Sequence, residues 1–542
     1  MYHHILRCAL VMSLALFPVS FRGAEKVEAD SDGKTFDSIE AALDGASGEV
    51  KLTLGEGDFS LPAVVPAGVT SLDIEGMGGS KVVFPASGNV EAADVAVAMS
   101  NVTFSKSTGA NNGFKGAASE TFTNVKFVDG AFYPMSTDVT IDGCEFTVNP
   151  SVTSTDDLSK YALRFQYRGA IGEPTLVKAV VRNTVFNTHM GTAVTAYNSA
   201  SDITFDNCLF MNKYEGDALK DAQSAIAYAG ATPDGEFPHT LTMINCGQSG
   251  FLGHYLSDSK LWACKTGQMT KVTIDGVEQT QPIVRDGNNY RLYTASALGL
   301  VATAVNDGFW KDGKLTVETW RGATLSLESD IDMAGVEFTP IGMMMWNPSK
   351  AFCGTFDGKN HTISNLTASD NTPNYASAGL FGALIGKCLN LTLKDVEINS
   401  THYAGGIAGY VDNETGSLID NCKVIGGTIT TATEQIDGGW DNGDKAGGIL
   451  GYGCINSDKV TNCHVEDVTI KGYRHCGSIV GYANTIANVT GNTALNVTLV
   501  WDNTHDYKNF GTTIGKNIFG EIVGNGTADS SNTATGVTLP TE

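Results

Sequence analysis

Basic residues are scarce in this chain of 542 residues. Lysine and arginine together number 35, against 59 aspartates and glutamates, which gives a formal net charge of −24. The acidic residues are scattered along the chain, so the net charge predicts a soluble protein whose molecules repel one another. This balance also excludes the basic patch that nucleic acids require, and we expect no nucleic-acid partner.

Long hydrophobic runs are missing after the N-terminus. Residues 1–24 combine Arg7, a mostly apolar stretch over residues 8–21 and small residues suitable for cleavage, which predicts a secretory signal peptide. No later stretch reaches the roughly 18–20 consecutive apolar residues that a transmembrane helix needs. The sequence therefore predicts an exported protein, extracellular or at the cell surface, without a transmembrane segment.

The motifs of common catalytic and cofactor sites are also missing. The sequence has no HExxH, GxSxG, GxxxxGK[ST] or CxxC pattern, which leaves metalloprotease, serine hydrolase, nucleotide and zinc-finger chemistry unsupported. The polar stretch 437–444 lacks the alternating ligands of an EF-hand loop, so the acidic surface allows only incidental Ca²⁺ binding. We expect no catalytic, cofactor-binding or metal-binding residue.

Short β-rich runs joined by Gly, Asn and Asp turns are what the chain does contain, from about residue 34 onward. Runs such as NVTF, NVKF, VTIDGCEF and ITFDNCLF each contain an Asn or a Gly at an equivalent position. These marker residues are Gly76, Asn101, Asn124, Gly143, Asn183, Asn207 and Asn245. The basic step between them is about 19–25 residues, and each of the two longer intervals is either one coil with an insertion or two coils.

A step of this length matches one circuit of a parallel β-helix, in which equivalent strands stack about 4.8 Å apart. Asparagine suits a repeated corner because it tolerates left-handed backbone and its amide can pair with the next coil. The sequence therefore predicts an all-β fold built from stacked coils.

Cysteines follow the marker position in four runs. They are Cys144, Cys208, Cys246 and Cys264. At equivalent coil positions these thiols would point the same way, which is poor disulfide geometry, so we expect a buried ladder of free thiols. Export permits disulfides, and the exceptions we favour are Cys353 with Cys388 and Cys454 with Cys476.

Residues 32–62, with the sequence DGKTFDSIEAALDGASGEVKLTLGEGDFSLP, resemble the opening of pectin-lyase-like right-handed β-helices. The resemblance covers roughly residues 32–280 and implies an amphipathic helix over the first coil, with Phe36, Ile39, Ala42 and Leu43 on its apolar face. Many such proteins are polysaccharide lyases or hydrolases, so the resemblance also implies a search for a carbohydrate-active site.

Glycine repeats mark the second half of the chain. The segments SAGLFG, AGGIAG, AGGILG, CGSIVG and FGEIVG end at Gly382, Gly409, Gly451, Gly481 and Gly524. They resemble GLUG repeats, and the segments at 323–343 and 352–367 are similar to the module that opens such a region. We expect glycine at these corners because it allows positive φ and close approach of neighbouring backbones.

Other residues of this half suggest a helix and an aromatic column. Apolar residues with helical spacing over residues 290–307 predict a short amphipathic helix. Tyr410, Tyr452 and Tyr482 each follow the last glycine of a repeat. We favour a packed ladder of stacked rings over a ligand-binding row.

A carbohydrate-active site, if one exists, would lie within residues 140–260. The groove candidates there are Arg164, Arg168, Asp217, Lys220 and Asp221. They do not form the ordered motifs (NxD, DD, GHG, RxK) of polygalacturonase-like enzymes. Asp156 and Asp157 fit a polar inserted loop better than a strand, and His254 lies in LGHYL and not in GHG.

The sequence thus predicts a signal peptide (1–24), a pectin-lyase-like parallel β-helix (25–280), a helix-containing module that opens the GLUG region (281–366), a GLUG-repeat β-solenoid (367–527) and a polar C-terminal tail (528–542). We favour a non-catalytic, adhesin-like or matrix protein whose partners are glycans or host or cell-surface proteins. The alternative is a carbohydrate-active β-helix enzyme with a divergent site. Trp310, Trp320, Trp346 and Trp440 are candidates for exposed sugar platforms, although at least half of them are expected in the core.

Overall fold

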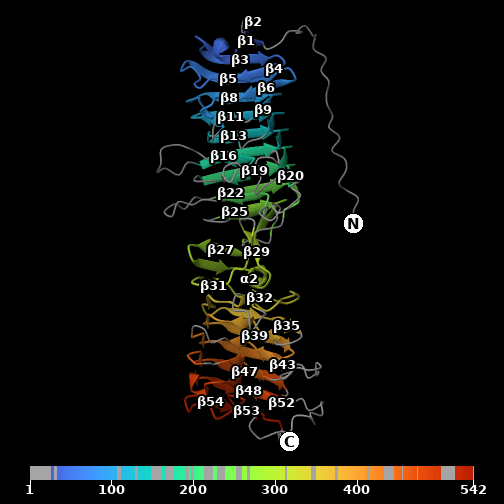
Figure 1. Cartoon of the computed structure of the whole chain (residues 1–542), viewed down its shortest axis with the longest axis vertical. Coiled ribbons are helices and arrows are strands. Elements are labelled where there is room, and N and C mark those ends of the chain that lie inside the picture. The colour runs from blue at the N-terminus through green and yellow to red at the C-terminus, as the bar shows by residue number, and fades with distance from the viewer. Residues whose placement is uncertain are drawn as a thin grey trace, which may run out of the picture.

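The computed structural model describes most of the chain between residues 26 and 540, so the expected signal peptide (1–24) lies outside the described residues. The described segments are 26–29, 33–105, 112–128, 132–147, 162–165, 176–188, 194–196, 200–212, 224–228, 239–251, 259, 261–264, 269–311, 314–342, 350–372, 376–411, 416–431, 445–453, 456–472, 474–501 and 519–540. They form an elongated all-β stack (Figure 1). We call β1–β26 the first region and β27–β54 the second region.

Three sheets and one strand pair make up the first region. The long sheet has the order β2 (Lys34–Phe36), β1 (Val27–Ala29), β3 (Gly48–Leu54), β5 (Val69–Gly76), β8 (Ala96–Ser100), β11 (Ser119–Thr123), β13 (Asp138–Asp142), β16 (Leu176–Arg182), β19 (Ala200–Asp206), β22 (His239–Ile244), β25 (Met269–Ile274) and β26 (Val277–Gln279). The second sheet has the order β23 (Gly247–Ser249), β20 (Leu209–Asn212), β17 (Val185–Thr188), β14 (Glu145–Thr147), β12 (Lys126–Val128), β9 (Thr103–Ser105), β6 (Ser80–Val83) and β4 (Gly57–Ser60). The third has β15 (Leu163–Phe165), β18 (Val194–Ala196), β21 (Ile226–Tyr228) and β24 (Trp262–Cys264), and β10 (Gly113–Lys115) pairs with β7 (Asn89–Glu91).

Four larger sheets make up the second region. The first has the order β27 (Ile283–Asp286), β28 (Asn289–Leu292), β31 (Thr324–Leu327), β33 (Thr355–Asp357), β38 (Lys387–Leu389), β42 (Leu418–Asp420), β46 (Lys459–Thr461) and β50 (Val489–Thr490). The second has β32 (Ile331–Asp332), β34 (Thr362–Ser364), β39 (Thr392–Ser400), β43 (Lys423–Thr431), β47 (His464–Gly472), β51 (Thr493–Leu495) and β54 (Thr533–Thr535), with β35 (Thr367–Asp370) beside β39 and β52 (Thr498–Trp501) beside β47.

The other two sheets of the second region meet at a corner. One has β36 (Ser377–Ala378), β40 (Tyr403–Gly405), β44 (Lys445–Gly447), β48 (His475–Gly477) and β53 (Phe519–Gly520). The other has β37 (Phe381–Leu384), β41 (Ala408–Val411), β45 (Leu450–Gly453) and β49 (Val480–Ala483). A hairpin of β29 (Phe309–Lys311) and β30 (Lys314–Thr316) and a 3-10 turn, η4 (Ile486–Asn488), complete the region.

The turn between the long sheet and the second sheet repeats the predicted marker position. Asn101, Asn124, Asn183 and Asn207 all have φ between 48° and 57°, a left-handed conformation that asparagine tolerates. The side chain of Asn207 donates to Asn183 Oδ1 at 2.8 Å, which links two successive turns. Gly76 differs from the prediction: it has no positive φ, and a Cβ there would lie 2.5 Å from the carbonyl oxygen of Asn101, so close packing explains this glycine.

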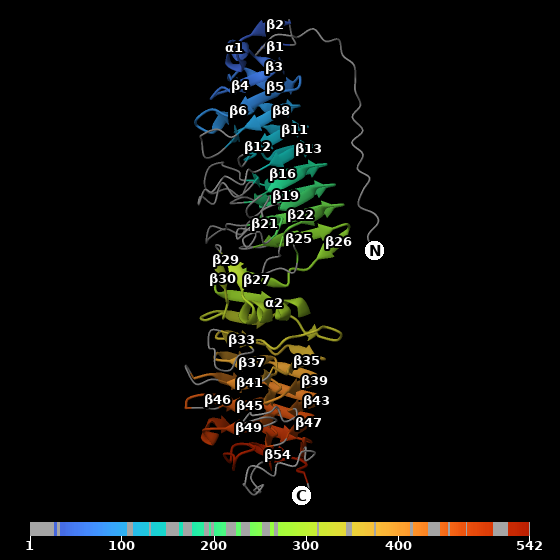
Figure 2. The same cartoon turned by 45° about the vertical axis from the view of Figure 1, so that its right-hand side comes forward.

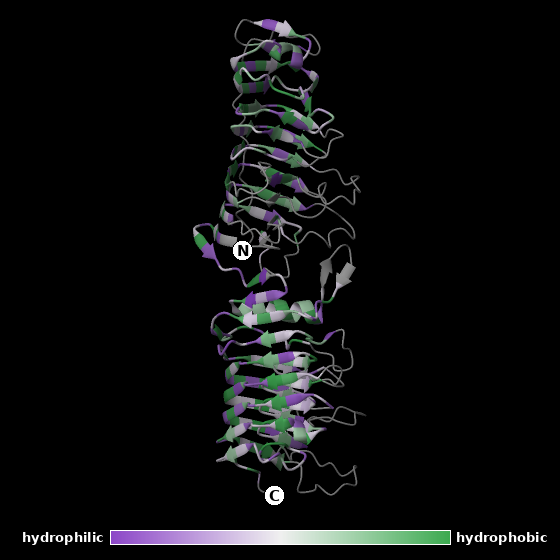
Figure 3. Cartoon of the chain, turned by 90° about the vertical axis from the view of Figure 1, so that its left-hand side faces the viewer, coloured by the Kyte–Doolittle hydropathy of each residue, from purple (hydrophilic) through white to green (hydrophobic). Residues whose placement is uncertain are grey.

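The interior of the first region contains a column of stacked phenylalanines. Phe127, Phe146, Phe186 and Phe210 are buried, and consecutive ring centroids lie 4.4, 4.9 and 4.9 Å apart with interplanar angles of 6–11°. In-register parallel pairing produces this column, because equivalent residues of β12, β14, β17 and β20 oppose one another. Apolar and polar residues alternate along the strands (Figure 3), as expected for one buried face.

Additional elements border both ends of the long sheet in the first region. At the start of the first region, helix α1 (Ile39–Leu43) buries Ile39, Ala42 and Leu43, and β1 is antiparallel to both β2 and β3. Phe36 lies in β2 and not in the helix, because Ser38 is the N-cap and accepts a hydrogen bond from Ala41 N at 3.1 Å. At the other end, β26 is antiparallel to β25.

Helix α2 (Ala295–Asn306) lies where the second region begins (Figure 2). Its face with Leu298, Val301 and Val305 is fully buried, in agreement with the predicted amphipathic helix. Asn306 anchors its C-terminal end: Nδ2 donates to Pro340 O and Oδ1 accepts from Gly342 N, both at 2.8 Å.

Three further sequence-based expectations are wrong. Cys264 lies in β24 of the third sheet, away from the turn that precedes Cys144 and Cys208, so it is not part of their column. Cys388 is a buried free thiol, so it forms no disulfide with Cys353. Residues 528–542 are not merely a tail, because β54 extends the sheet beyond β51.

Candidate functional site

Two columns of side chains meet at the corner between the β40–β44–β48 and β41–β45–β49 strands. The first column is Tyr403, Lys445 and His475, which are register partners on adjacent strands. The second is Tyr410, Tyr452 and Tyr482, which are also in register. We call these six side chains the corner cluster. Their neighbours on the strands, including Ala404, Ala446 and Cys476, point into the core, so the cluster lies on the outer side of the corner.

The predicted tyrosine ladder is confirmed. The ring centroids of Tyr410 and Tyr452, and those of Tyr452 and Tyr482, lie 5.6 Å apart. The ladder has a further member that the glycine repeats did not indicate, because the Tyr403 ring stacks on Tyr452 at 5.3 Å. Tyr403 stands two residues before a glycine pair, as does Lys445, and that shared offset is the signal that could have identified the first column.

Lys445 is placed among the aromatic rings. Its Nζ lies 4.9 Å from the ring centroids of both Tyr403 and Tyr452 and 5.6 Å from that of Tyr482. A cation in this position is attracted by the negative faces of the rings, and the attraction grows when water is excluded. Lys445 is 8% exposed, so this contact fixes the arrangement of the cluster.

Exposure divides the cluster into an inner and an outer part. Tyr403 and Tyr410 are each 2% exposed, whereas Tyr452, Tyr482 and His475 are partly exposed. The His475 and Tyr482 rings meet edge to face at 4.8 Å. Asn484 Nδ2 lies 3.4 Å from the Tyr452 hydroxyl. The outer part therefore offers aromatic surface with polar groups at its edge, which is the chemistry that holds sugar rings.

In the first region, the structure describes only one of the five groove candidates, Arg164. Arg164 lies on β15 of the third sheet, is 5% exposed, and its guanidinium is 5.6 Å from the ring centroid of Tyr133. The other groove candidates lie outside the described residues: Arg168, Asp217, Lys220, Asp221, Asp156, Asp157 and His254.

Glu120 is a buried acid that sequence reasoning missed. Its Oε2 accepts hydrogen bonds from Met135 N at 2.7 Å and Ser136 N at 2.9 Å, while Oε1 has no partner among the described residues. Burial raises the pKa of Glu120 to about 7, although the backbone donors favour the charged form. The signal was present in the alternation of SETFT, which places Glu120 on the same face as the buried Phe122.

Ser201 and His239 form a buried pair on neighbouring strands of the long sheet. Ser201 Oγ and His239 Nδ1 are 2.9 Å apart, and burial lowers the pKa of His239 to about 4. A nucleophile must reach its substrate, but Ser201 is 1% exposed and His239 is 5% exposed. We interpret this pair as part of the core.

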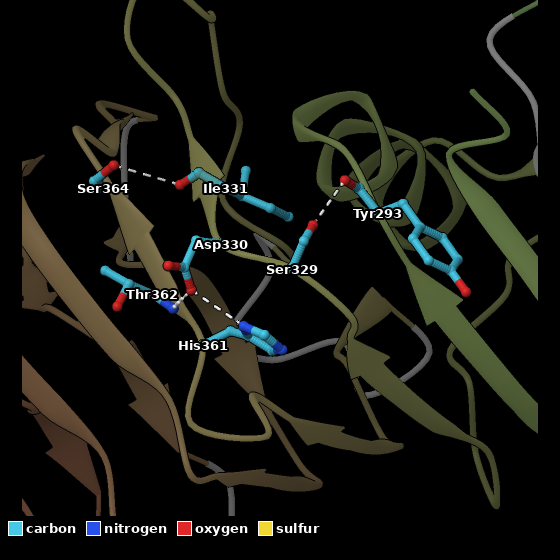
Figure 4. A network of polar contacts seen from close by, with 7 residues as sticks. All are labelled: Tyr293, Ser329, Asp330, Ile331, His361, Thr362 and Ser364. Atoms are coloured by element: carbon cyan, nitrogen blue, oxygen red, sulfur yellow. Dashed lines mark hydrogen bonds and ion pairs between the residues drawn. The ribbon is translucent and has the colours of Figure 1, made fainter. Parts of the chain in front are cut away.

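A polar network joins the start of the second region to its first coils (Figure 4). Asp330 Oδ1 accepts from Thr362 N at 2.9 Å and lies 3.1 Å from His361 Nδ1. The Thr362 N–H, followed by His361, lowers the pKa of the Asp330 carboxyl. Ser329 Oγ donates to Tyr293 O at 3.1 Å. These bonds connect the segment between β31 and β32 to Tyr293, which follows β28, and to the start of β34. We interpret the network as structural.

Three core thiols of the second region lie in contact. Cys388, Cys422 and Cys463 are at most 1% exposed, and the Sγ atoms of Cys388 and Cys422 are 3.8 Å apart. Burial raises the pKa of the Cys388 thiol well above its usual value. In the first region, Cys144 and Cys208 follow the same pattern of buried free thiols, as predicted.

The remaining expectations concern metals, membranes and tryptophans. Within the described segments, no group of three or more His, Cys, Asp or Glu side chains is arranged to hold a metal ion. Among the helices of that part of the chain, none is long and apolar enough to cross a membrane. Trp320 is 1% exposed and belongs to the core. Trp346, Trp440 and the side chain of Trp310 lie outside the described residues.

Comparisons with known proteins give limited matches. No family model matches the chain. A stretch of 130 residues, 21% of this chain, is 32% identical to halomucin from Haloquadratum walsbyi (strain DSM 16790 / HBSQ001), and the chain covers 1% of the length of that protein. A crystal structure described as a putative immunoglobulin A1 protease from Bacteroides ovatus aligns with 47% of this chain and 86% of its own, at a TM-score of 0.23 and 17% identity.

Proposed function

We propose that this chain is a secreted or cell-surface β-solenoid that binds extended glycans or cell-surface proteins without catalysis, as an adhesin-like or matrix protein. In this proposal residues 25–280 are a right-handed, pectin-lyase-like parallel β-helix, 281–366 open the GLUG region, and 367–527 form a GLUG-repeat solenoid. Its last coil continues into residues 528–540.

The repeated geometry supports the architectural part of the proposal. Neighbouring strands within each long sheet pair in parallel, apart from the antiparallel strands at the ends. Their register is continuous except for shifts after Gly48 and after His239. Left-handed asparagines recur at one turn of each region, including Asn390, Asn421 and Asn462 in the second. The Asn421 side chain donates to Asn390 Oδ1 at 2.9 Å, the same coil-to-coil link that Asn207 makes in the first region.

The outer part of the corner cluster is the observation that carries the binding proposal. Tyr452 and Tyr482 present two rings 5.6 Å apart on successive coils, with His475 and Asn484 beside them. A regular polymer can repeat its contacts along such a column, which suits an extended chain better than a small molecule. Because Lys445 and the inner tyrosines hold the column rigidly, little side-chain entropy is lost on binding.

Glycan-array screening followed by titration tests this site. We expect Tyr482→Ala to weaken binding of the selected glycan about tenfold, since aromatic contacts are worth about 1 kcal/mol or more, and Tyr482→Phe to retain most of it because the ring remains. Thr428→Ala, on an exposed face of β43, is the control and should bind normally. Unchanged binding by Tyr482→Ala would move the site elsewhere on the molecule.

A carbohydrate-active site in residues 140–260 is the second candidate. The observation that favours it is Arg164 on β15, a groove candidate from the sequence whose guanidinium lies 5.6 Å from the ring centroid of Tyr133. We expect no release of unsaturated or reducing ends from pectins, alginates or glycosaminoglycans. Turnover that Arg164→Ala abolishes, and that the exposed-site control Arg182→Ala keeps, would favour the enzyme instead.

A further inference from the structure

In the described chain the tyrosine ladder stops at Tyr482, although the glycine corner continues for one more coil. A Cβ on Gly481 or on Gly524 would lie 2.6 or 2.4 Å from the carbonyl oxygen of the corner glycine one coil earlier, so the two glycines occupy equivalent places. A parallel bridge joins the two coils two residues before the ladder position. Asn525 therefore stands where the next ring of the ladder would stand.

The side chain of Asn525 is turned onto the backbone of the neighbouring strand. Its Oδ1 accepts from Ala483 N at 3.0 Å, and its Nδ2 donates to Ala483 O at 2.9 Å. These two bonds replace the pairing that a further strand would give to Ala483. An amide held in this way is smaller than a phenol ring and does not extend the stack over Tyr482.

The partners of the Tyr482 ring lie on its own coil or on the coil before it. The Tyr452 ring centroid and Lys445 Nζ, both on the preceding coil, are each 5.6 Å from the Tyr482 ring centroid. His475, on the same coil, meets the ring edge to face at 4.8 Å. No described residue of the following coil adds a ring or a cation, and Tyr482 is partly exposed. The stack is thus open to one more ring on this side.

The opposite end of the ladder is closed. Tyr410 is 2% exposed, and its register partner on the preceding coil, Ala383, is 1% exposed. A ligand ring can therefore join the ladder only beyond Tyr482.

Neutral polar groups lie beside the open end. Asn484 is exposed, and its Nδ2 lies 3.4 Å from the Tyr452 hydroxyl. Amides and phenol hydroxyls both donate and accept hydrogen bonds, as sugar hydroxyls require. The net charge of −24 disfavours the approach of acidic glycans. This chemistry fits a neutral sugar that has one apolar face.

We propose that one neutral pyranose of the bound glycan stacks on Tyr482, in the place that Asn525 leaves open, and so extends the tyrosine ladder by one ring. The C–H face of the sugar lies on the aromatic ring, and the Asn484 amide bonds its hydroxyls. The inference rests on the proposed function and adds to it the position and the class of the sugar that is held.

Isothermal titration with neutral oligosaccharides of glucose, galactose, mannose and N-acetylglucosamine tests this position, with oligogalacturonate as the acidic probe. We expect Asn525→Tyr to weaken binding of the neutral oligosaccharide about tenfold or more, because the new ring covers Tyr482. Asn525→Leu covers the same ring without adding an aromatic one and should weaken binding similarly.

Asn525→Ala is the matched control. It removes the same two bonds to Ala483 but leaves the place above Tyr482 open, so binding should stay within about threefold of the unaltered chain. Circular dichroism and melting of each variant show whether it is folded.

The outcomes separate this inference from the proposed function. If Tyr482→Ala loses binding while Asn525→Tyr and Asn525→Leu bind normally or more tightly, the glycan contacts the side of the ladder: the inference is overturned and the proposed function stands. Normal binding by Tyr482→Ala contradicts the proposed site itself. Tighter binding of oligogalacturonate than of any neutral probe, or binding of none of these sugars, would also overturn the inference.

Discussion

Glu120 occupies a position that apolar side chains fill on both neighbouring strands. Its register partners are Val97 on β8 and Val139 on β13, each 1% exposed. The acid is retained in the core because its carboxylate accepts the N–H groups of Met135 and Ser136, which lie in a turn without a sheet partner. One side chain thus satisfies two backbone donors at the cost of burying an ionisable group.

The raised pKa of Glu120 predicts a pH-dependent stability. The folded value of about 7 lies above the ordinary value of 4.5, so the folded state holds the proton more tightly. Its contribution is fully present below about pH 4.5 and is lost as the pH rises through 7, by about 3 kcal/mol. The glutamine variant has no such proton to lose. We therefore expect the free energy of unfolding of Glu120→Gln, relative to that of the unaltered chain, to increase by about 3 kcal/mol between pH 4.5 and 8.

Urea unfolding at several pH values measures this difference, and Glu49→Gln on the exposed face of β3 is the control. The control should show the same pH dependence as the unaltered chain. If Glu120→Gln also follows that dependence, the carboxyl does not titrate in the folded state as we infer.

At the scale of elements, the glycines of the second region act by close approach. Neither Gly409 nor Gly451 has positive φ, contrary to the prediction from the sequence. A Cβ on Gly409 would lie 2.4 Å from Ser377 Oγ, and one on Gly451 would lie 2.6 Å from Gly409 O. The corner between the two sheets therefore brings one strand against the backbone of the next, and only glycine leaves room for it.

This reasoning predicts that alanine, and not only a β-branched residue, is damaging at the corner. We expect Gly451→Ala to destabilise by about 1–3 kcal/mol through overpacking. The matched control is Gly299→Ala in helix α2, where no neighbouring atom lies within 4 Å of the added Cβ, and which should stabilise by up to about 1 kcal/mol. Urea unfolding monitored by fluorescence gives the change in free energy of unfolding for both variants. Equal, small effects would contradict the close-approach explanation.

Much of the repetitive structure could be predicted because repeated residues report their own spacing. The asparagine turns and the column of Tyr410, Tyr452 and Tyr482 occupy equivalent places in the sequence and in space. Glu120 and Lys445 were missed because each departs from the residue types of its register partners: Glu120 replaces an apolar residue on a single strand, and Lys445 is paired with a tyrosine and a histidine. Cys264 was misplaced because its context, AC, resembles NC although its strand belongs to another sheet.

At the scale of the whole molecule, the apolar interior is divided between the two regions. The buried apolar residues divide into one large cluster over Val27–Val272 and another over Ile283–Val523. In each long sheet a strand pairs with the strands before and after it in the sheet order, so added strands lengthen the sheet without thickening it.

Small-angle X-ray scattering of the purified chain, extrapolated to low concentration, tests the stacking most directly. A compact fold of 542 residues would have a radius of gyration of about 24 Å and a nearly symmetric distribution of interatomic distances. Stacked coils predict a clearly larger radius of gyration and a distribution with an early peak and a long tail, as for a rod. A radius near the compact value with a symmetric distribution would contradict the stacking of coils.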